Sequence, residues 1–468
     1  MKSGLPLLAA LALAAGCAAG PDYRRPEIEA VPEYKEAGDW KLAQPQDALE
    51  RGKWWEVFAD RQLGALVEQV EVSNQNVRVA EARFRQAQAL LTSSRSAYYP
   101  TLDADVSLTR SRSPTGVIGG TTAGRIITNR SASLNSRWEA DLWGRLRRTV
   151  ESVEANAQAS AADLVAARLS LQAELAANYF QLRALDAQQQ LLEDTVAAFR
   201  RSLELTRNRY AAGVAAKVDV AQGETQLKST QAQALDLGVQ RAQLEHAIAV
   251  LVGRPPSGFS IAAVPLSATP PRIPPGLPSA LLERRPDIAA AERRVAAANA
   301  QIGVAKAAYF PSLTLSASYG SRSADAAQWL TAPSRFWSIG PALAQSIFDA
   351  GLRRAQTAQA IAAYDATVAE YRQAVLAGFQ EVEDNLAALR ILEEEAKVQE
   401  EAVRAARESV ELTLNQYKAG TVSYTNVVTA QTAQLANERA AAGILGRRLV
   451  AAVGLIKALG GGWSAAEL

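Results

Sequence analysis

The stretch RSAYYPTLDADVSL at residues 95–108 returns later in the chain as KAAYFPSLTLSASY at residues 306–319. These two copies align at an offset of 211 residues, and LTRNRYAAG (205–213) aligns with LTLNQYKAG (412–420) at an offset of 207. The two matching segments lie about a hundred residues apart in each half of the chain. This indicates a tandem duplication of two long halves rather than a stack of short repeats. The first repeat covers residues 60–253, and the second covers residues 279–460.

Directly after the proline of each copy, apolar and polar residues alternate with a period of two. This pattern predicts strands that have one apolar and one polar face, and Asp103 and Asp105 belong to the polar face. Aromatic residues gather at the strand ends, and such strands are typical of a transmembrane β-barrel, although a half-buried sheet of a soluble protein is the alternative. The expected strands, two in each repeat, lie at about residues 101–110, 130–142, 312–321 and 336–347.

The rest of each repeat is expected to be helical, and two of the helices are very long. Residues 145–210 contain neither proline nor glycine, and residues 352–417 contain only Gly378. At about 1.5 Å per residue, each helix would run on the order of 100 Å. Apolar residues spaced by four and three predict laterally packed, coiled-coil helices. The expected helices, one long and one shorter in each repeat, cover residues 145–210, 217–252, 351–417 and 424–459.

Four strands are too few to close a barrel, because about eight is the smallest number that spans a membrane. The chain must therefore oligomerise, and each repeat contributes one hairpin and one helical excursion. The turns at Gly213 and Gly420 end the long helices about 100 Å away from the strands. The expected product is a duct, in which a short barrel in the membrane continues as a long helical tube.

The N-terminus MKSGLPLLAALALAAGC (1–17) has one early charge and an apolar run that is too short to span a bilayer. Residues 1–16 are therefore expected to be a secretory signal peptide. The sole cysteine, Cys17, stands where a bacterial lipoprotein would be acylated, and residues 17–59 would form a lipidated arm. A plain signal peptide followed by a stray cysteine is the alternative.

Composition argues against several classes of function. The 50 basic and 48 acidic residues are spread along the chain and leave a net charge of +2, so nothing indicates nucleic-acid binding. One histidine, His246, and one cysteine are too few for a nucleophilic catalytic site or a nitrogen and sulfur metal site. We expect no enzyme, no metal ion and no cofactor apart from the covalent lipid, and His246 is expected to be an ordinary helix residue.

Short motifs in order along the chain carry a resemblance to a known family. They are GCAAGPDYRRP (16–26), WWEVFADRQLGALVEQV (54–70), LLERRPDIAAAE (281–292), AAYFPSL (307–313), KALGGGW (457–463) and the two YxxG turns. Together they resemble the outer-membrane channel proteins of tripartite efflux and secretion systems, the TolC/OprM type, and specifically the lipoprotein subgroup.

The resemblance implies a mainly α fold with a transmembrane β-barrel: a trimer that has a twelve-stranded barrel and a twelve-helix periplasmic tunnel. The arm at residues 18–60, the proline-rich crossover at 254–278 and the C-terminal tail at 461–468 would contribute to an equatorial band. The chain would sit in the cell outer membrane, anchored by lipid, and export small toxic compounds passively.

The partners implied by the resemblance are a periplasmic adaptor and an inner-membrane pump of the resistance-nodulation-division type. The cargo stays open among antibiotics, solvents, dyes and metal ions. A soluble periplasmic coiled-coil adaptor or structural protein is the alternative class. Such a protein would show one helical hairpin inside β-rich domains rather than two full repeats.

The resemblance also implies that the tube closes at its periplasmic tip, where Asp219 and Tyr417 hold the closed state by hydrogen bonds between helices. This sequence departs from the family pattern at Val422, Asn426 and Thr429, where some members carry charged residues. We therefore expect a more neutral gate, formed by Asp219, Tyr417, Tyr424, Asn426 and Thr429. A capping role for Asp219 at the start of the next helix is the alternative.

Overall fold

The computed structural model describes residues 18–28, 34–36, 53–112, 114, 125–266, 268–273 and 284–461. The expected signal peptide, Cys17 and tail residues 462–468 lie outside the described residues. Within these ranges the chain is mainly helical. None of the helices in the described part carries an apolar run long enough to cross a bilayer.

The described elements repeat from one half of the chain to the other. The paired helices have equal lengths: 22 residues in α3 and α7, 67 in α4 and α8, and 35 in α5 and α9. After α2 (Arg61–Ser73), the first half contains α3 (Gln75–Ser96), β1 (Thr101–Arg112), β2 (Ile126–Ala140), α4 (Arg145–Ala211) and α5 (Lys217–Leu251). The second half contains α7 (Pro286–Ala307), β3 (Ser312–Ser323), β4 (Arg335–Ala344), α8 (Leu352–Lys418) and α9 (Tyr424–Ala458).

The chain divides into two compact units. The first, which we call the sheet unit, contains described residues 18–27, 84–160 and 291–371. The second, which we call the helical unit, contains the other described residues. Each long helix therefore contributes its first turns to the sheet unit and its later turns to the helical unit.

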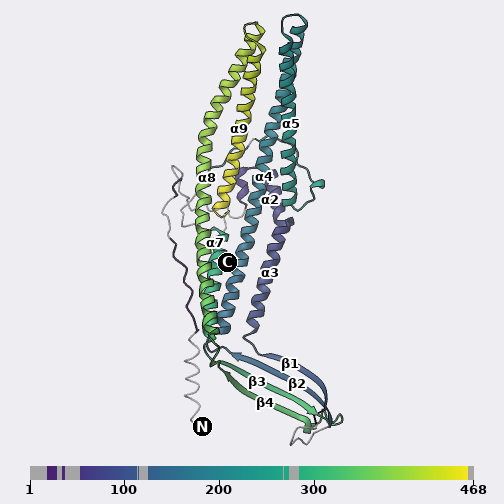
Figure 1. Cartoon of the computed structure of the whole chain (residues 1–468), viewed down its shortest axis with the longest axis vertical. Coiled ribbons are helices and arrows are strands. Elements are labelled where there is room, and N and C mark those ends of the chain that lie inside the picture. Colours follow the sequence, from purple (N-terminus) through teal and green to yellow (C-terminus); the bar gives the residue numbers. More distant parts are fainter. Residues whose placement is uncertain are drawn as a thin grey trace. The chain divides into compact units, whose positions relative to one another are not determined.

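The strands of the sheet unit form one antiparallel sheet in the order β1-β2-β3-β4 (Figure 1). β1 pairs with β2 from Thr101↔Arg137 to Arg112↔Ile126, and β3 pairs with β4 from Ser312↔Ala344. Every residue of β1 is exposed, and both β1 and β4 keep an unpaired edge within the sheet. A sheet with two open edges invites pairing with another chain.

β1 and β3 each run two residues beyond the end expected from sequence, and the bounds of β2 and β4 differ more. β2 begins at Ile126 because that residue pairs with Arg112 at the end of β1, and it stops at Ala140. Asp141, expected within the strand, instead accepts hydrogen bonds from the backbone nitrogens of Leu146 (3.0 Å) and Arg147 (2.8 Å), which caps α4. β4 ends at Ala344, opposite the first residue of β3, and its Pro341 is tolerated because β4 is an edge strand of this sheet.

Within the sheet unit, residues 19–22, at the start of the described chain, pack against α4 and α7. The backbone nitrogen of Ala19 donates to Trp143 O (2.9 Å), and Arg148 pairs with Asp22 (2.8 Å). Gly20 adopts a φ of +99°, and a Cβ there would lie 2.4 Å from the Cα of Gly303. The GPDY part of the first motif is thus explained by close packing of an extended segment against helices.

The helical unit is packed along the heptad positions. Leu175, Leu182 and Leu192 of α4 are fully buried, and Val375 and Val382 of α8 are equally inaccessible. Tyr210 continues the same four-and-three spacing but is 46% exposed, because it lies in the last turn of α4. Thr206 is a polar residue at a position of this spacing, yet it is fully buried, and its hydroxyl donates to Ser202 O (3.0 Å).

Three arginines of the helical unit bind carboxylates and backbone carbonyls, and two of them, Arg183 and Arg285, are buried. Arg183 and Arg241 both bind the carboxylate of Asp186, at 2.8 and 2.7 Å, and they donate to the carbonyls of Ala262 and Ile261 in the crossover. Arg285, from the LLERRPD motif, pairs in the same way with two carboxylates and the Ala458 carbonyl. Arg183 and Arg241 therefore anchor the crossover, whereas Arg285 connects the start of α7 with α8 and with the end of α9.

Candidate functional site

The tips of both helical hairpins turn at a glycine in the left-handed region. Gly213 has a φ of +75° between α4 and α5, and Gly420 has a φ of +79° between α8 and α9. Added Cβ atoms would meet nothing within 4 Å at either position. The requirement for glycine is therefore conformational, since L side chains disfavour positive φ, and not steric.

Two buried tyrosines form the centre of the α8–α9 tip. Tyr417 and Tyr424 are 4% and 2% exposed, and their ring centroids lie 5.3 Å apart with an interplanar angle of 57°. They pack with Val427 in one apolar cluster. Burial raises the pKa of Tyr424, so its phenol stays protonated at neutral pH.

Tyr424 also connects α9 with the first repeat. Its hydroxyl lies 3.2 Å from Ser202 Oγ on α4. Gly223 of α5 lies under the same ring, because a Cβ at this glycine would be 3.3 Å from the Tyr424 hydroxyl. Tyr424 therefore joins the two hairpins at the tip through one hydroxyl pair and one small-residue contact.

Tyr417 makes a different contact. The guanidinium carbon of Arg209 lies 4.9 Å from the centre of the Tyr417 ring, and Arg209 Nη1 donates to Lys418 O (3.2 Å). Among the described residues, no partner hydrogen-bonds to the Tyr417 hydroxyl. Tyr417 therefore joins α4 to α8 through its ring and not through its hydroxyl.

Asp219 acts at the start of α5. Its Oδ2 accepts a hydrogen bond from Ala216 N (3.2 Å), and its own nitrogen donates to Ala216 O (3.1 Å). Within the described part of the chain, no hydrogen bond joins Asp219 to Tyr417 or Tyr424. This geometry fits the capping alternative, because an acidic side chain in the first turn satisfies a free backbone N–H.

The two remaining gate candidates lie apart from the tyrosine cluster. Asn426 and Thr429 are exposed on α9. The Asn426 side chain accepts from the Ser423 hydroxyl at 3.4 Å, and the Thr429 hydroxyl donates to Thr425 O (2.9 Å) within the helix. The structure thus separates the candidates into a buried tyrosine pair, a helix cap and an exposed polar pair.

Polar links between α5 and α9 were not predicted from the sequence. Three such contacts recur along the two helices: Thr425 to Gln222 (3.1 Å), Gln226 to Thr432 (3.0 Å) and Arg439 to Gln233 (3.0 Å). The glutamines of α5 recur at intervals of four and seven, which is the helical period of one face. The glutamine spacing could have predicted a polar contact face on α5 from the sequence, but the apolar seams of the longer helices are the stronger signal.

The polar face of the sheet carries a hydrogen-bond network around one of the predicted lumen residues. Asn135 Nδ2 donates to Asp105 Oδ2 (2.7 Å), and Ser318 Oγ donates to Asn135 Oδ1 (2.8 Å). Asp103 lies on the same face of β1, because alternate residues share a face. The network joins three adjacent strands through their polar side chains.

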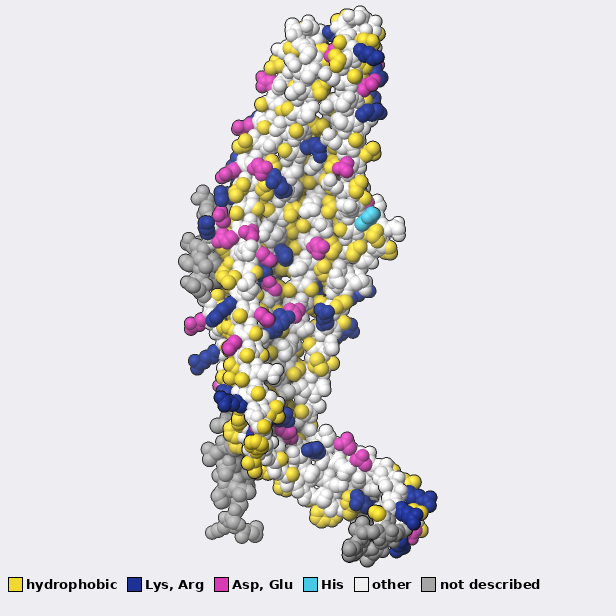
Figure 2. All heavy atoms as spheres, in the orientation of Figure 1, with side chains coloured by type: hydrophobic (Ala, Val, Ile, Leu, Met, Phe, Trp, Pro, Cys, Tyr) yellow, Lys and Arg dark blue, Asp and Glu magenta, His cyan; other side chains and the backbone are white. Residues whose placement is uncertain are grey.

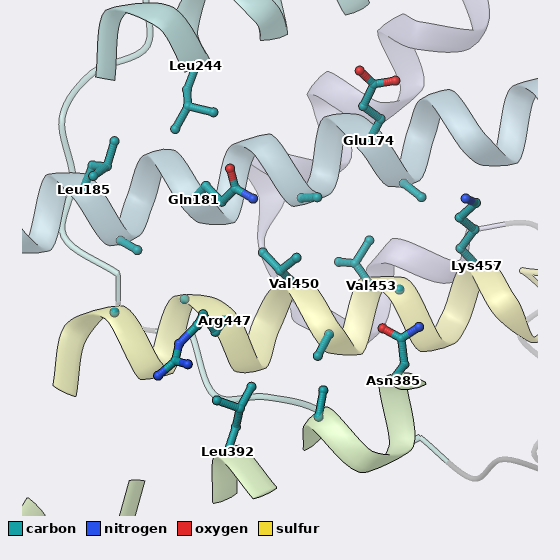
Figure 3. Close-up of a pocket in the computed structure, with 18 of the residues that line it drawn as sticks. Glu174, Gln181, Leu185, Leu244, Asn385, Leu392, Arg447, Val450, Val453 and Lys457 are labelled. Carbon is teal, nitrogen blue, oxygen red and sulfur yellow. The ribbon is translucent and has the colours of Figure 1, made fainter. Parts of the chain in front are cut away.

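The helical unit contains an open groove of about 1300 Å³ between helices of both repeats (Figure 3). Arg447 of α9 and Glu395 of α8 form an ion pair at its edge (2.7 Å), and amides such as Gln181 line it with small and aliphatic residues. Gly446 allows the close approach of α9 to α4, since a Cβ there would lie 2.7 Å from the Ala184 Cβ. Within the described residues, no group of three His, Cys, Asp or Glu side chains could hold a metal ion.

Comparison with known proteins matches this architecture over almost the whole chain. The profile of the family described as "Outer membrane efflux protein" matches residues 66–254 and 277–461. The chain is 32% identical over 464 residues to the pyoverdine export outer membrane protein OpmQ of Pseudomonas aeruginosa, covering 98% of this chain and 97% of that protein.

A second relative and a solved structure give the same result. Identity to the toluene efflux pump outer membrane protein TtgC of Pseudomonas putida is 32% over 466 residues, which is 99% of this chain and 96% of the relative. The structure of the outer-membrane channel OprN has a TM-score of 0.89 at 32% identity, covering 96% of this chain and 100% of that one. The matches include both repeats and both tyrosine-bearing helices.

Proposed function

Because this chain belongs to the outer membrane efflux protein family and is an exit duct of the outer membrane, we propose that it works as a homotrimer. The observation that carries this proposal is the four-stranded sheet with two unpaired edges. Three copies would supply twelve strands, enough for a closed barrel, whereas one copy has too few. Family membership also argues against the soluble adaptor alternative, because the relatives are outer-membrane proteins by name.

The pump-side partners belong to the proposal. Members of this family serve as the outer-membrane component of tripartite efflux pumps, and we assign this chain a periplasmic adaptor and an inner-membrane pump of the resistance-nodulation-division type. The names of the relatives include pyoverdine export and toluene efflux, so the cargo class differs between members. Small toxic compounds are the proposed cargo, exported passively without an enzymatic step.

Each polar surface has a proposed place in the duct. The face with Asp103 and Asp105 would line the barrel lumen, because the opposite face carries the apolar residues that lipid requires. The groove beside Arg447 would form part of the tunnel wall, where mixed charges and amides suit unrelated cargoes. The tip around Tyr417 and Tyr424 would be the closed gate, supported by their burial and by the Ser202 contact.

Lipidation of Cys17 is proposed as the anchor. Ala19, two residues later, is hydrogen-bonded to Trp143 at the junction of β2 and α4. In a trimeric barrel that junction is the periplasmic end of the strands, so the acyl chains would enter the inner leaflet.

Native mass spectrometry of the detergent-extracted protein tests the trimer, and complementation of an efflux-deficient strain tests export. A trimer that restores drug or solvent resistance is expected. A monomer, or a protein recovered without detergent, would contradict the proposal. The variant Asp103→Cys should react with a water-soluble thiol reagent in membranes, whereas Val106→Cys should not.

A further inference from the structure

Arginine side chains gather at the loop end of the sheet, where the two hairpins turn. Residues 106–132 and 321–335, the loop ends of the two hairpins, contain six arginines and a single carboxylate, Asp325. Figure 2 shows Lys and Arg side chains gathered at this end of the sheet. Such an excess of one sign needs a partner of opposite charge or exposure to water.

The strand register places four of these arginines on the apolar face. Leu102, Ala104, Val106 and Leu108 share one face of β1, and the next two residues of that face are Arg110 and Arg112. Arg130 of β2 lies opposite Leu108, so it belongs to the same face. Ala132, two residues after Arg130, pairs with Ser321 of β3, and Ser321 pairs with Arg335 of β4. Arg335 therefore belongs to this face as well. We call Arg110, Arg112, Arg130 and Arg335 the arginine row.

On the same face, the side chains between the helix end of the sheet and the arginine row are arranged as on the lipid-facing surface of a barrel. Aliphatic side chains occupy the middle of the face, and Tyr319 pairs with Trp337 next to the row. These two aromatic side chains are 54% and 74% exposed. Aromatic girdles of this kind mark the interface between hydrocarbon and headgroups in barrels.

The distance along the strand agrees with that position. Arg110 is eight residues from Leu102, which is about 27 Å of strand and about 20 Å of membrane depth at the usual tilt. The apolar band of a barrel is about 25 Å tall, so the arginine row lies at its far edge. Long arginine side chains there extend to the headgroups.

The arginines of the row are close to one another, and among the described residues no carboxylate forms an ion pair with them. Arg110 pairs with Thr128, two residues from Arg130, so the two arginines are diagonal neighbours at about 7–8 Å. Arg130 uses one N–H on Ala324 O (3.0 Å), which leaves most of its donors available. Asp325 accepts from Ala327 N (2.9 Å), and no ion pair among the described residues joins it to the row.

We propose that the arginine row binds the phosphate groups of phosphorylated glycolipid in the outer leaflet and fixes the depth of the barrel in the membrane. Guanidinium groups bind phosphate in bidentate fashion, and a phosphate between neighbouring arginines relieves their repulsion. The proposal rests on the proposed trimeric barrel, since only the outer face of a barrel meets lipid.

The opposite face provides a matched control. Arg322 lies at the same end of the sheet, but it belongs to the polar face, where its guanidinium carbon sits 5.2 Å from the Phe336 ring centre. Arg322→Gln removes one positive charge without touching the lipid-facing row. A general effect of net charge would therefore appear in this variant as well.

The test is a titration of purified trimer with bisphosphorylated lipid A in detergent, followed by native mass spectrometry. The variant R110Q/R112Q/R130Q/R335Q should bind lipid A at least about tenfold more weakly than wild type. Dephosphorylated lipid A should bind the wild type as weakly as lipid A binds the variant. The corresponding four-lysine variant should retain part of the affinity, because it keeps the charge but loses the bidentate geometry.

Equal binding by wild type and R110Q/R112Q/R130Q/R335Q would overturn the inference. A loss of affinity in Arg322→Gln as large, per charge removed, as in the fourfold variant would overturn it too. Displacement of lipid A by inorganic phosphate at the same concentration as the lipid would also overturn the inference, because the arginine row would then be a binding site for free phosphate. The same spectra report the oligomeric state. A functional trimer without phosphate preference refutes this inference alone, whereas a monomer refutes the proposed channel.

Discussion

The tip contact between Tyr424 and Ser202 gives the sharpest prediction about gating. Tyr424→Phe removes one hydroxyl and keeps the ring that packs on Tyr417 and over Gly223. A buried hydrogen bond between neutral groups contributes about 1 kcal/mol net. Three protomers that open together would lose about 3 kcal/mol, which shifts the closed-to-open ratio by roughly 150-fold.

Single-channel conductance in planar bilayers measures this shift, and susceptibility to a large antibiotic reports it in cells. Tyr424→Phe should raise the open fraction and sensitise cells, while thermal stability falls only slightly because the apolar packing remains. Ser202→Ala should produce a similar shift, since it removes the other half of the same hydrogen bond.

Tyr417→Phe is the matched control for this prediction. Its hydroxyl is buried and has no hydrogen-bond partner in the described part of the chain, so its removal costs no hydrogen bond. The variant should conduct like wild type and be equally stable or slightly more stable. If Tyr417→Phe opened the channel as much as Tyr424→Phe, the Ser202 contact would not be the closing interaction.

Four further changes probe other parts of the chain. Gly420→Ala should lower the free energy of unfolding by about 1 kcal/mol in denaturant titration, because φ is +79° although space is free; a larger loss would contradict a purely conformational role. Gly20→Ala should release the arm to limited proteolysis, since its Cβ would overlap Gly303, while conductance stays unchanged. Arg285→Leu leaves Asp287 and Glu381 without their partner and should reduce stability by about 2–3 kcal/mol, less than for a fully buried pair because both carboxylates are half exposed; an unchanged melting temperature would argue against this anchor. Cys17→Ser should abolish incorporation of labelled palmitate, and label that persisted would exclude Cys17 as the acylated residue.

Much of the architecture follows from local sequence signals. The offsets of 211 and 207 residues already indicated the duplication, and the absence of proline and glycine predicted a long helix where α4 runs from Arg145 to Ala211. Alternation after Pro100 assigned Asp103 and Asp105 to a polar face. Such signals survive folding because backbone breakers and periodicity act within one segment, whatever it packs against.

Contacts between segments depended on the tertiary structure. The β2 start at Ile126 follows from pairing with Arg112, and Tyr424 reaches Ser202 more than two hundred residues away. The arginine row became visible only once register connected Arg110, Arg130 and Arg335 across four strands. A shift of one residue in pairing would have moved any of them to the other face, and no single segment carries that information.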